Sequence, residues 1–145
     1  MLIVHILVKE RVASAITETV TLTYEERCRH RQRLVTDQGR EVHLALPRAT
    51  VLRHGDALIS VPELTVEVVA APESVIDIKA SDWLTSARVA HQLGNWHRPV
   101  QILSEGILRT LRDAPLHDWL SRSGIRFEEA ERPFHPNLLG AGHHP

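Results

Sequence analysis

Apolar and polar side chains alternate along much of the first seventy residues, and this alternation constrains the fold more than any other feature of the chain. Apolar residues recur at every second position around Val20, Leu34 and Val42–Leu46. This spacing is typical of strands that bury one face. Glycines in Asp37–Gly39 and His54–Asp56 supply the turns that such strands need between them. The pattern predicts several short strands in a small β barrel or sandwich.

Two further segments of this region have a predicted local structure. The apolar run Leu2–Val8 is expected to form a strand rather than an export signal, because His5 interrupts it and Lys9–Arg11 follows it directly. Thr23–Glu26 has the spacing of a capping box, in which a Thr and a Glu side chain accept hydrogen bonds from each other's backbone amides. A single helical turn is therefore expected after Thr23.

The pattern changes at Pro72, since a proline restricts the backbone of the residue before it. Beyond it the sequence predicts a strand, a helix, two strands, a helix and a strand, in that order, over residues 74–80, 81–93, 99–104, 107–112, 115–123 and 125–130. Gly94–Asn95 is expected to stop the first of these helices. The order is the split βαβ arrangement of ferredoxin-like folds, in which two helices cover one face of a four-stranded antiparallel sheet.

The expected architecture is therefore α+β in two parts. A small all-β N-terminal domain spans residues 1–71, and a ferredoxin-like βαββαβ domain spans residues 72–134. Residues 135–145 lack periodicity and are expected to form a flexible tail that contains histidines.

Composition excludes several classes of protein. The 17 Lys and Arg residues nearly cancel the 18 Asp and Glu residues, so the chain has no net field to hold nucleic acid or an acidic membrane. The basic run Arg27–Arg33 lacks interleaved aromatic residues and indicates a solvated strand face or a protein-docking patch. Cys28 is the only cysteine, which excludes an intrachain disulfide and suits a reducing compartment. No stretch approaches the roughly 20 apolar residues of a membrane helix.

Histidine is the unusual component, with ten residues. Imidazole binds borderline metals, so this number suggests a metal site. His91 falls in the last turn of the expected helix, where it is either a cation favoured by the helix dipole or a metal ligand. His97 lies in the loop beyond, where it is either hydrogen-bonded to backbone or a ligand. The helix end separates the two, so they need not coordinate together.

One fixed histidine is too few for a transition metal, which takes four or more donors. In a twofold dimer the same residue appears twice, so His97 near the axis would present two imidazoles to one ion. His143 and His144 follow Gly140–Gly142 and could complete the shell; the alternative is a tag remnant or an unstructured terminus. His135 has a comparable place in the tail, although the prolines around it restrict it.

Four motifs in order resemble the urease accessory protein E family. They are TYEER at 23–27, LVTDQGREV at 34–42, LPRATVLRHGD at 46–56 and LGNWHRPVQ at 93–101. The resemblance spans nearly the whole chain, including Pro133–Phe134 and the Gly-His ending. Several separate motifs in the right order make it more specific than any one of them.

The resemblance implies a cytoplasmic nickel chaperone that helps to load the urease active site and is not itself an enzyme. In that family a β domain similar to the peptide-binding domain of heat-shock-40 co-chaperones precedes a ferredoxin-like domain that binds metal and dimerises. The family's metal histidine closes a Leu-Gly-Asn-x-His motif, which is His97 here, and C-terminal histidines add ligands, which corresponds to His143 and His144. The implied partners are a urease maturation GTPase, other urease accessory proteins and apo-urease.

The chain departs from the family pattern in three places. Trp96 stands where many members have Arg, and Gln92 stands where many have His. The tail has two adjacent histidines in place of a long His-rich run. Storage of many ions is therefore not expected.

The leading hypothesis is a homodimer that holds Ni(II) between two copies of His97. His143 and His144 are the exchangeable ligands, His91 and His135 are accessory candidates, and Zn(II) or Cu(II) should also bind such donors. The alternative is a peptide- or protein-binding adaptor with a co-chaperone-like role, in which metal binding is incidental. A third hypothesis, a metal-dependent hydrolase, lacks a convergent carboxylate.

Overall fold

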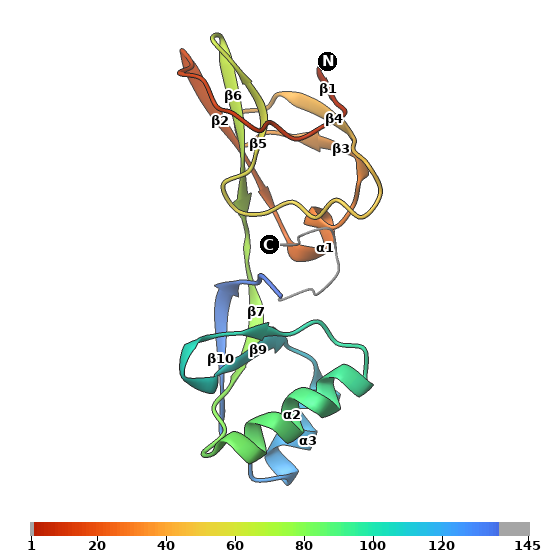
Figure 1. The fold of residues 1–145 in the computed structure, drawn as a ribbon, viewed down its shortest axis with the longest axis vertical. Coiled ribbons are helices and arrows are strands. Elements are labelled where there is room, and N and C mark those ends of the chain that lie inside the picture. The colour runs from red at the N-terminus through yellow and green to blue at the C-terminus, as the bar shows by residue number, and fades with distance from the viewer. Residues whose placement is uncertain (1, 137–145) are drawn as a thin grey trace. The chain divides into compact units, whose positions relative to one another are not determined.

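The computed structural model describes residues 2–136. Within this range the chain divides between Ala71 and Pro72 into two compact units (Figure 1). Each unit has its own cluster of buried apolar side chains. None of the helices in the described range is both long and apolar enough to cross a bilayer.

The first unit contains two three-stranded sheets, ordered β1-β4-β3 and β2-β6-β5. Its elements are β1 (Leu2–Val4), β2 (Ile16–Leu22), α1 (Tyr24–Arg27), β3 (Arg31–Val35), β4 (Glu41–Ala45), β5 (Ala57–Val61) and β6 (Leu64–Ala70). Each sheet is an antiparallel hairpin to which an earlier strand is added in parallel: β1 pairs with β4, and β2 pairs with β6.

The core of this unit is built from the apolar side chains that recur at every second position along its strands, as the sequence predicts. Val20 and Leu22 on β2, Leu34 on β3, and Val42 and Leu44 on β4 are each at most 6% exposed. They belong to one buried cluster that draws residues from both sheets. The predicted all-β half is therefore confirmed as two sheets that share a core.

The predicted turn signals are also confirmed. The backbone amide of Thr23 donates to Glu26 Oε1 at 2.9 Å, and the Thr23 hydroxyl accepts from the Glu26 amide at 3.2 Å, which is a complete capping box at the start of α1. Gly39 and Gly55 have φ angles of 95° and 91°, in the left-handed region that glycine reaches without strain.

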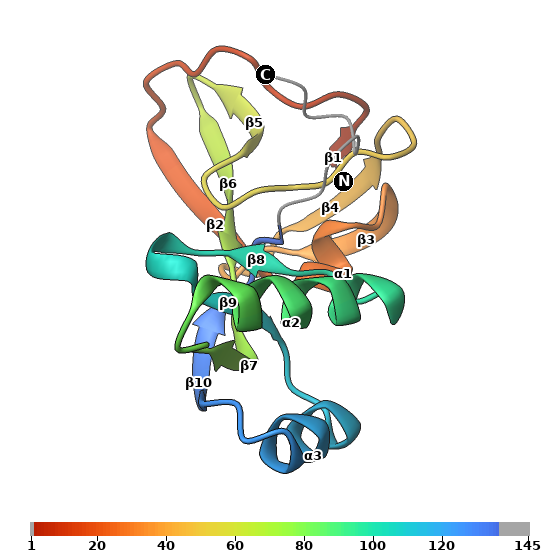
Figure 2. The same ribbon diagram turned by 60° about the horizontal axis from the view of Figure 1, so that its bottom comes forward.

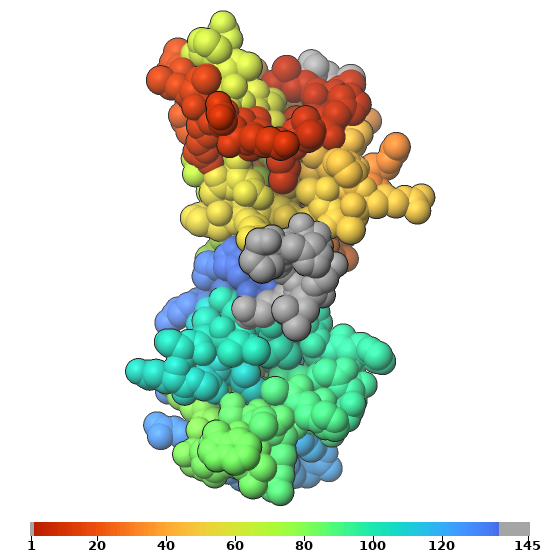
Figure 3. All heavy atoms as spheres, in the orientation of Figure 1, coloured from red at the N-terminus to blue at the C-terminus, as the bar shows by residue number. Residues whose placement is uncertain are grey.

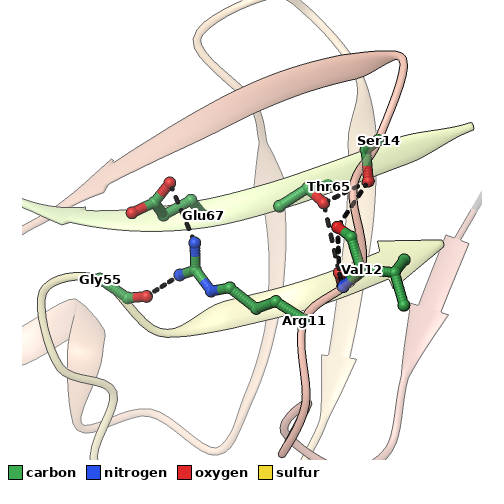
Figure 4. Close-up of polar contacts among 7 residues, drawn as sticks. Arg11, Val12, Ser14, Gly55, Thr65 and Glu67 are labelled. Atoms are coloured by element: carbon green, nitrogen blue, oxygen red, sulfur yellow. Dashed lines mark hydrogen bonds and ion pairs between the residues drawn. The ribbon is translucent and has the colours of Figure 1, made fainter. Parts of the chain in front are cut away.

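The strand predicted over Leu2–Val8 is shorter than expected, because β1 ends at Val4. Side-chain contacts hold the chain beyond it (Figure 4). Arg11 donates to the carbonyl of Gly55 and forms an ion pair with Glu67, with 3.5 Å between Nη1 and Oε2. After the apolar run ends, hydrogen bonds and an ion pair made by side chains thus hold the chain in place of strand pairing.

The second unit has the βαββαβ order predicted from the sequence. Its elements are β7 (Pro72–Ile78), α2 (Trp83–Asn95), β8 (Gln101–Ile102), the 3₁₀ turn η1 (Ser104–Gly106), β9 (Leu108–Leu111), α3 (Ala114–Arg122) and β10 (Phe127–Pro133). The sheet order is β10-β7-β9-β8, and every pairing is antiparallel. The ferredoxin-like topology is therefore confirmed.

Both helices pack on one face of this sheet (α2 and α3 in Figure 2). The shared buried cluster consists of Ile76, Ile78, Val89, Leu93, Leu108, Leu116 and Leu120. The opposite face carries the ion pair between Asp77 and Arg109, with 2.7 Å between Oδ1 and Nε. One face is thus an apolar core, and the other holds charged side chains.

Candidate metal site

Helix α2 leads directly to the predicted metal histidine. It begins after Asp82, whose carboxylate accepts the Thr85 amide at 2.7 Å, and this bond lowers the pKa of Asp82 below its ordinary value. Val89 and Leu93 anchor the helix in the core, while its other side lies at the surface of the second unit (green in Figure 3). The helix C-terminus is therefore well fixed.

The sequence predicts that this helix stops at Gly94–Asn95, with Gly94 as the residue that turns the chain. The helix does run to Asn95, but Gly94 is itself helical, and the left-handed residue that terminates the helix is His97, with a φ angle of 56°. The Arg98 amide donates to the Leu93 carbonyl at 2.9 Å, and the His97 amide donates to the Gly94 carbonyl at 3.0 Å. These two bonds make a Schellman motif in which histidine occupies the position that glycine usually takes.

His97 is exposed in this position. A side chain in the left-handed region costs about 1 kcal/mol, because Cβ crowds the following carbonyl. Such strain persists where the surrounding structure fixes it, and it is concentrated at functional sites. The terminated helix therefore presents an imidazole to solvent from a backbone with little freedom.

Both neighbours of His97 contact α3. The rings of Trp96 and Trp119 meet edge to face, with centroids 5.2 Å apart and an interplanar angle of 79°. The Arg98 guanidinium forms an ion pair with Asp113, the N-cap of α3. The sequence pattern points to His97 but to neither Trp119 nor Asp113, which lie 15 or more residues further along the chain.

His91 lies on the exposed side of α2, one turn before its end. Its Nδ1 is 3.4 Å from Nδ2 of Asn95. Among residues 2–136 no three His, Cys, Asp or Glu side chains converge as a set that could hold a metal ion. His91 and His97 are therefore not brought into a common ligand set within the described part of one chain.

His135 is placed by a contact with the strand that follows His97. Its backbone amide donates to Gln101 Oε1 at 2.9 Å. Just before it, Arg109 Nη1 lies 3.5 Å from the carbonyl of Pro133. The chain thus passes from β10, at one edge of the sheet, to β8 at the other edge. His143 and His144 lie outside the described residues.

Comparisons with known proteins match both units. A model of the UreE urease accessory protein N-terminal domain matches residues 3–71, and a model of its C-terminal domain matches residues 73–145. Proteins named urease accessory protein UreE from Burkholderia lata and Burkholderia vietnamiensis are each 42% identical over 127 residues, and that from Burkholderia thailandensis is 44% identical over 127 residues. Each alignment covers 86% of this chain but only 61%, 63% and 59% of these relatives, respectively.

Proposed function

Because the chain belongs to the UreE family of urease accessory proteins, we propose that it binds Ni(II) as cargo and hands it on during assembly of the urease metal centre. The observation that carries this proposal is the conformation of His97. Its backbone adopts an angle that glycine would adopt with less strain, and its side chain is exposed. Under this proposal, the metal-binding role of the imidazole is the reason for a histidine at this position.

The cargo is held between two copies of the chain. A divalent transition metal takes four or more donors, and one exposed imidazole is a poor site by itself. A twofold axis beside His97 supplies two imidazoles to one ion. His143 and His144 act as exchangeable ligands that complete the shell, with His91 and His135 as accessory ligands. Zn(II) and Cu(II) substitute for Ni(II) in such a donor set.

The proposed role is capture and release rather than catalysis. Catalytic metal sites hold a water against a closed pocket with fixed ligands, whereas an exposed loop histidine and tail ligands allow an ion to leave. The chain acts in the cytoplasm and passes the ion to a urease maturation GTPase, with other urease accessory proteins and apo-urease as further partners.

Calorimetric titration of the metal-free chain with NiCl2 at pH 7.5 tests the proposal. We expect one tight ion per dimer, and light scattering should give the mass of a dimer. His97→Ala should lose the tight site. His117→Ala, which removes a part-exposed imidazole from α3, is the matched control and should keep it. Unchanged tight binding in His97→Ala would reject the assignment.

An adaptor role for the first unit is the second candidate. Ile6, Ile16 and Val35 are each more than half exposed there, so these apolar side chains are available to contact a partner protein. In a urease activation assay the adaptor role requires His97→Ala to support activation fully. The nickel role requires the same variant to fail.

A further inference from the structure

A side chain within α3 and the N-cap residue just before it contact the residues on either side of His97. Trp119 contacts the ring of Trp96, and Asp113 binds the guanidinium of Arg98. The first contact lies midway along α3, and the second lies at its N-terminus. The left-handed turn at His97 is thus attached at both ends to one helix.

Asp113 uses its two carboxylate oxygens for different purposes. Oδ1 accepts the Leu116 amide at 2.8 Å and caps α3, whereas Oδ2 accepts from Arg98 Nη2. Within residues 2–136, Arg98 Nε is buried without a hydrogen-bond partner. The attachment of the Arg98 guanidinium therefore depends on the Asp113 charge.

Helix α3 is itself a rigid support. Leu116 and Leu120 are fully buried in the cluster that also contains Leu93 of α2. Close-packed apolar clusters deform little, so a side chain fixed on α3 keeps its place relative to the end of α2. The strained turn at His97 needs such support, because a residue in a sparsely populated conformation keeps it only while the surroundings define it.

We propose that Asp113 and Trp119 are positioning residues for metal capture, which hold the Trp96–Arg98 turn on α3 so that His97 presents its imidazole in one orientation. This inference rests on the proposed nickel role of His97. A metal site between two copies requires both imidazoles to point at one ion. Variation in the orientation of His97 therefore weakens the site through both of its imidazole ligands. Residues that orient metal ligands from outside the ligand set typically change affinity by about 10- to 100-fold when they are replaced.

The variant Asp113→Asn separates the two functions of this residue. Asparagine is as good an N-cap as aspartate, so the cap of α3 is kept while the charge that binds Arg98 is lost. Asp82→Asn is the matched control, because Asp82 caps α2 in the same way through the Thr85 amide. Both variants lose one carboxylate at a helix N-cap, and only Asp113→Asn releases Arg98.

Two measurements on the full chain report the result. Nickel titration should show affinity about 10-fold or more weaker in Asp113→Asn and unchanged in Asp82→Asn. Amide hydrogen exchange of metal-free protein should show faster exchange at the Arg98 and His97 amides in Asp113→Asn only. Since a general loss of stability would speed exchange throughout the unit, the acceleration must be confined to this turn. Wild-type affinity and exchange in Asp113→Asn would overturn the proposal.

A second pair of variants keeps the test decisive if Asp113→Asn folds poorly. Trp119→Phe retains an aromatic edge for Trp96 and should bind nickel nearly as tightly as the wild type, whereas Trp119→Leu should bind about 10-fold more weakly. Equal affinity in the two variants would overturn the role of Trp119. If His97→Ala binds nickel normally, the proposed function fails instead, and the exchange data then stand as the separate test of the anchoring.

Discussion

Arg40 donates two hydrogen bonds to the carboxylate of Glu18, with 2.9 Å from Nη2 to Oε2 and 3.1 Å from Nε to Oε1. The Thr36 hydroxyl donates to Oε1 of the same carboxylate at 2.8 Å. Glu18 lies on β2 of one sheet, and Arg40 directly precedes β4 of the other. This contact therefore joins the two sheets of the first unit by a charged pair at the edge of their core.

The Glu18–Arg40 contact predicts a pH-dependent stability. Hydrogen bonds from Arg40 and Thr36 hold the pKa of Glu18 below its ordinary value. A carboxyl group with a lowered pKa in the folded state stabilises that state above the ordinary glutamate value of about 4.3, and this contribution is lost as the pH falls through the lowered pKa. Glu18→Gln should therefore be less stable than the wild type at pH 7, with the difference shrinking in acid.

Urea titrations followed by circular dichroism between pH 7 and pH 3 measure this difference. Glu10→Gln is the control, because Glu10 is exposed, and its effect should be small at every pH. A Glu18→Gln difference that stays constant across the titration would contradict the prediction.

The backbone strain at His97 predicts that a substitution there can raise the stability of the fold while it removes nickel binding. We expect His97→Gly to raise the free energy of unfolding by about 0.5–1 kcal/mol. The substitution removes the strain energy of a left-handed residue with a Cβ, and this gain exceeds the entropic cost of ordering glycine from the unfolded chain. The same variant should lose nickel binding. Urea denaturation of metal-free protein measures the first effect, and His97→Ala, which keeps a Cβ, should show no such gain.

Gly94 provides the complementary prediction, because its place in the helix differs from the one its sequence context suggests. A Cβ added at Gly94 meets nothing within 4 Å, and its backbone is helical. Gly94→Ala should therefore stabilise the second unit by about 0.5–1 kcal/mol. If Gly94 were instead the left-handed residue that ends the helix, the same substitution would destabilise the unit, and thermal unfolding distinguishes the two outcomes.

Nickel should stabilise the folded chain by mass action. At free nickel a hundred times above the dissociation constant, binding to the folded state alone contributes about 2.7 kcal/mol. Thermal unfolding of the wild type should shift upward on adding NiCl2 and return on adding EDTA. The shift should persist in His117→Ala and be absent from His97→Ala. An equal shift in all three proteins would show that the stabilising ion binds elsewhere.

Local signals were sufficient to predict most of the fold. The capping box at Thr23–Glu26 and the turns at Gly39 and Gly55 depend on a few adjacent residues, and the structure contains all three. The βαββαβ order also follows from segment patterns, because each strand and helix of the second unit has its own periodicity. The candidate histidine His97 was identified through its motif.

The remainder depends on contacts that local patterns do not encode. The parallel pairing of β1 with β4 joins residues about forty positions apart, such as Leu2 and Val42. The left-handed residue that terminates α2 was misplaced, because a glycine in the last turn resembles a stop signal. The turn that follows is fixed instead through α3, by Asp113 and Trp119.

Separate cores predict separate responses to core substitutions. The three tryptophans, Trp83, Trp96 and Trp119, all belong to the second unit, so tryptophan fluorescence reports its unfolding alone. Leu116→Ala deletes a fully buried side chain there and should lower the free energy of unfolding by about 2–5 kcal/mol, seen as a fluorescence transition at lower urea. Leu58→Ala makes the same deletion in the first unit and should move the circular dichroism transition while leaving the fluorescence transition in place. Since each cluster draws its buried residues from its own unit, equal fluorescence shifts in the two variants would mean that the units unfold as one.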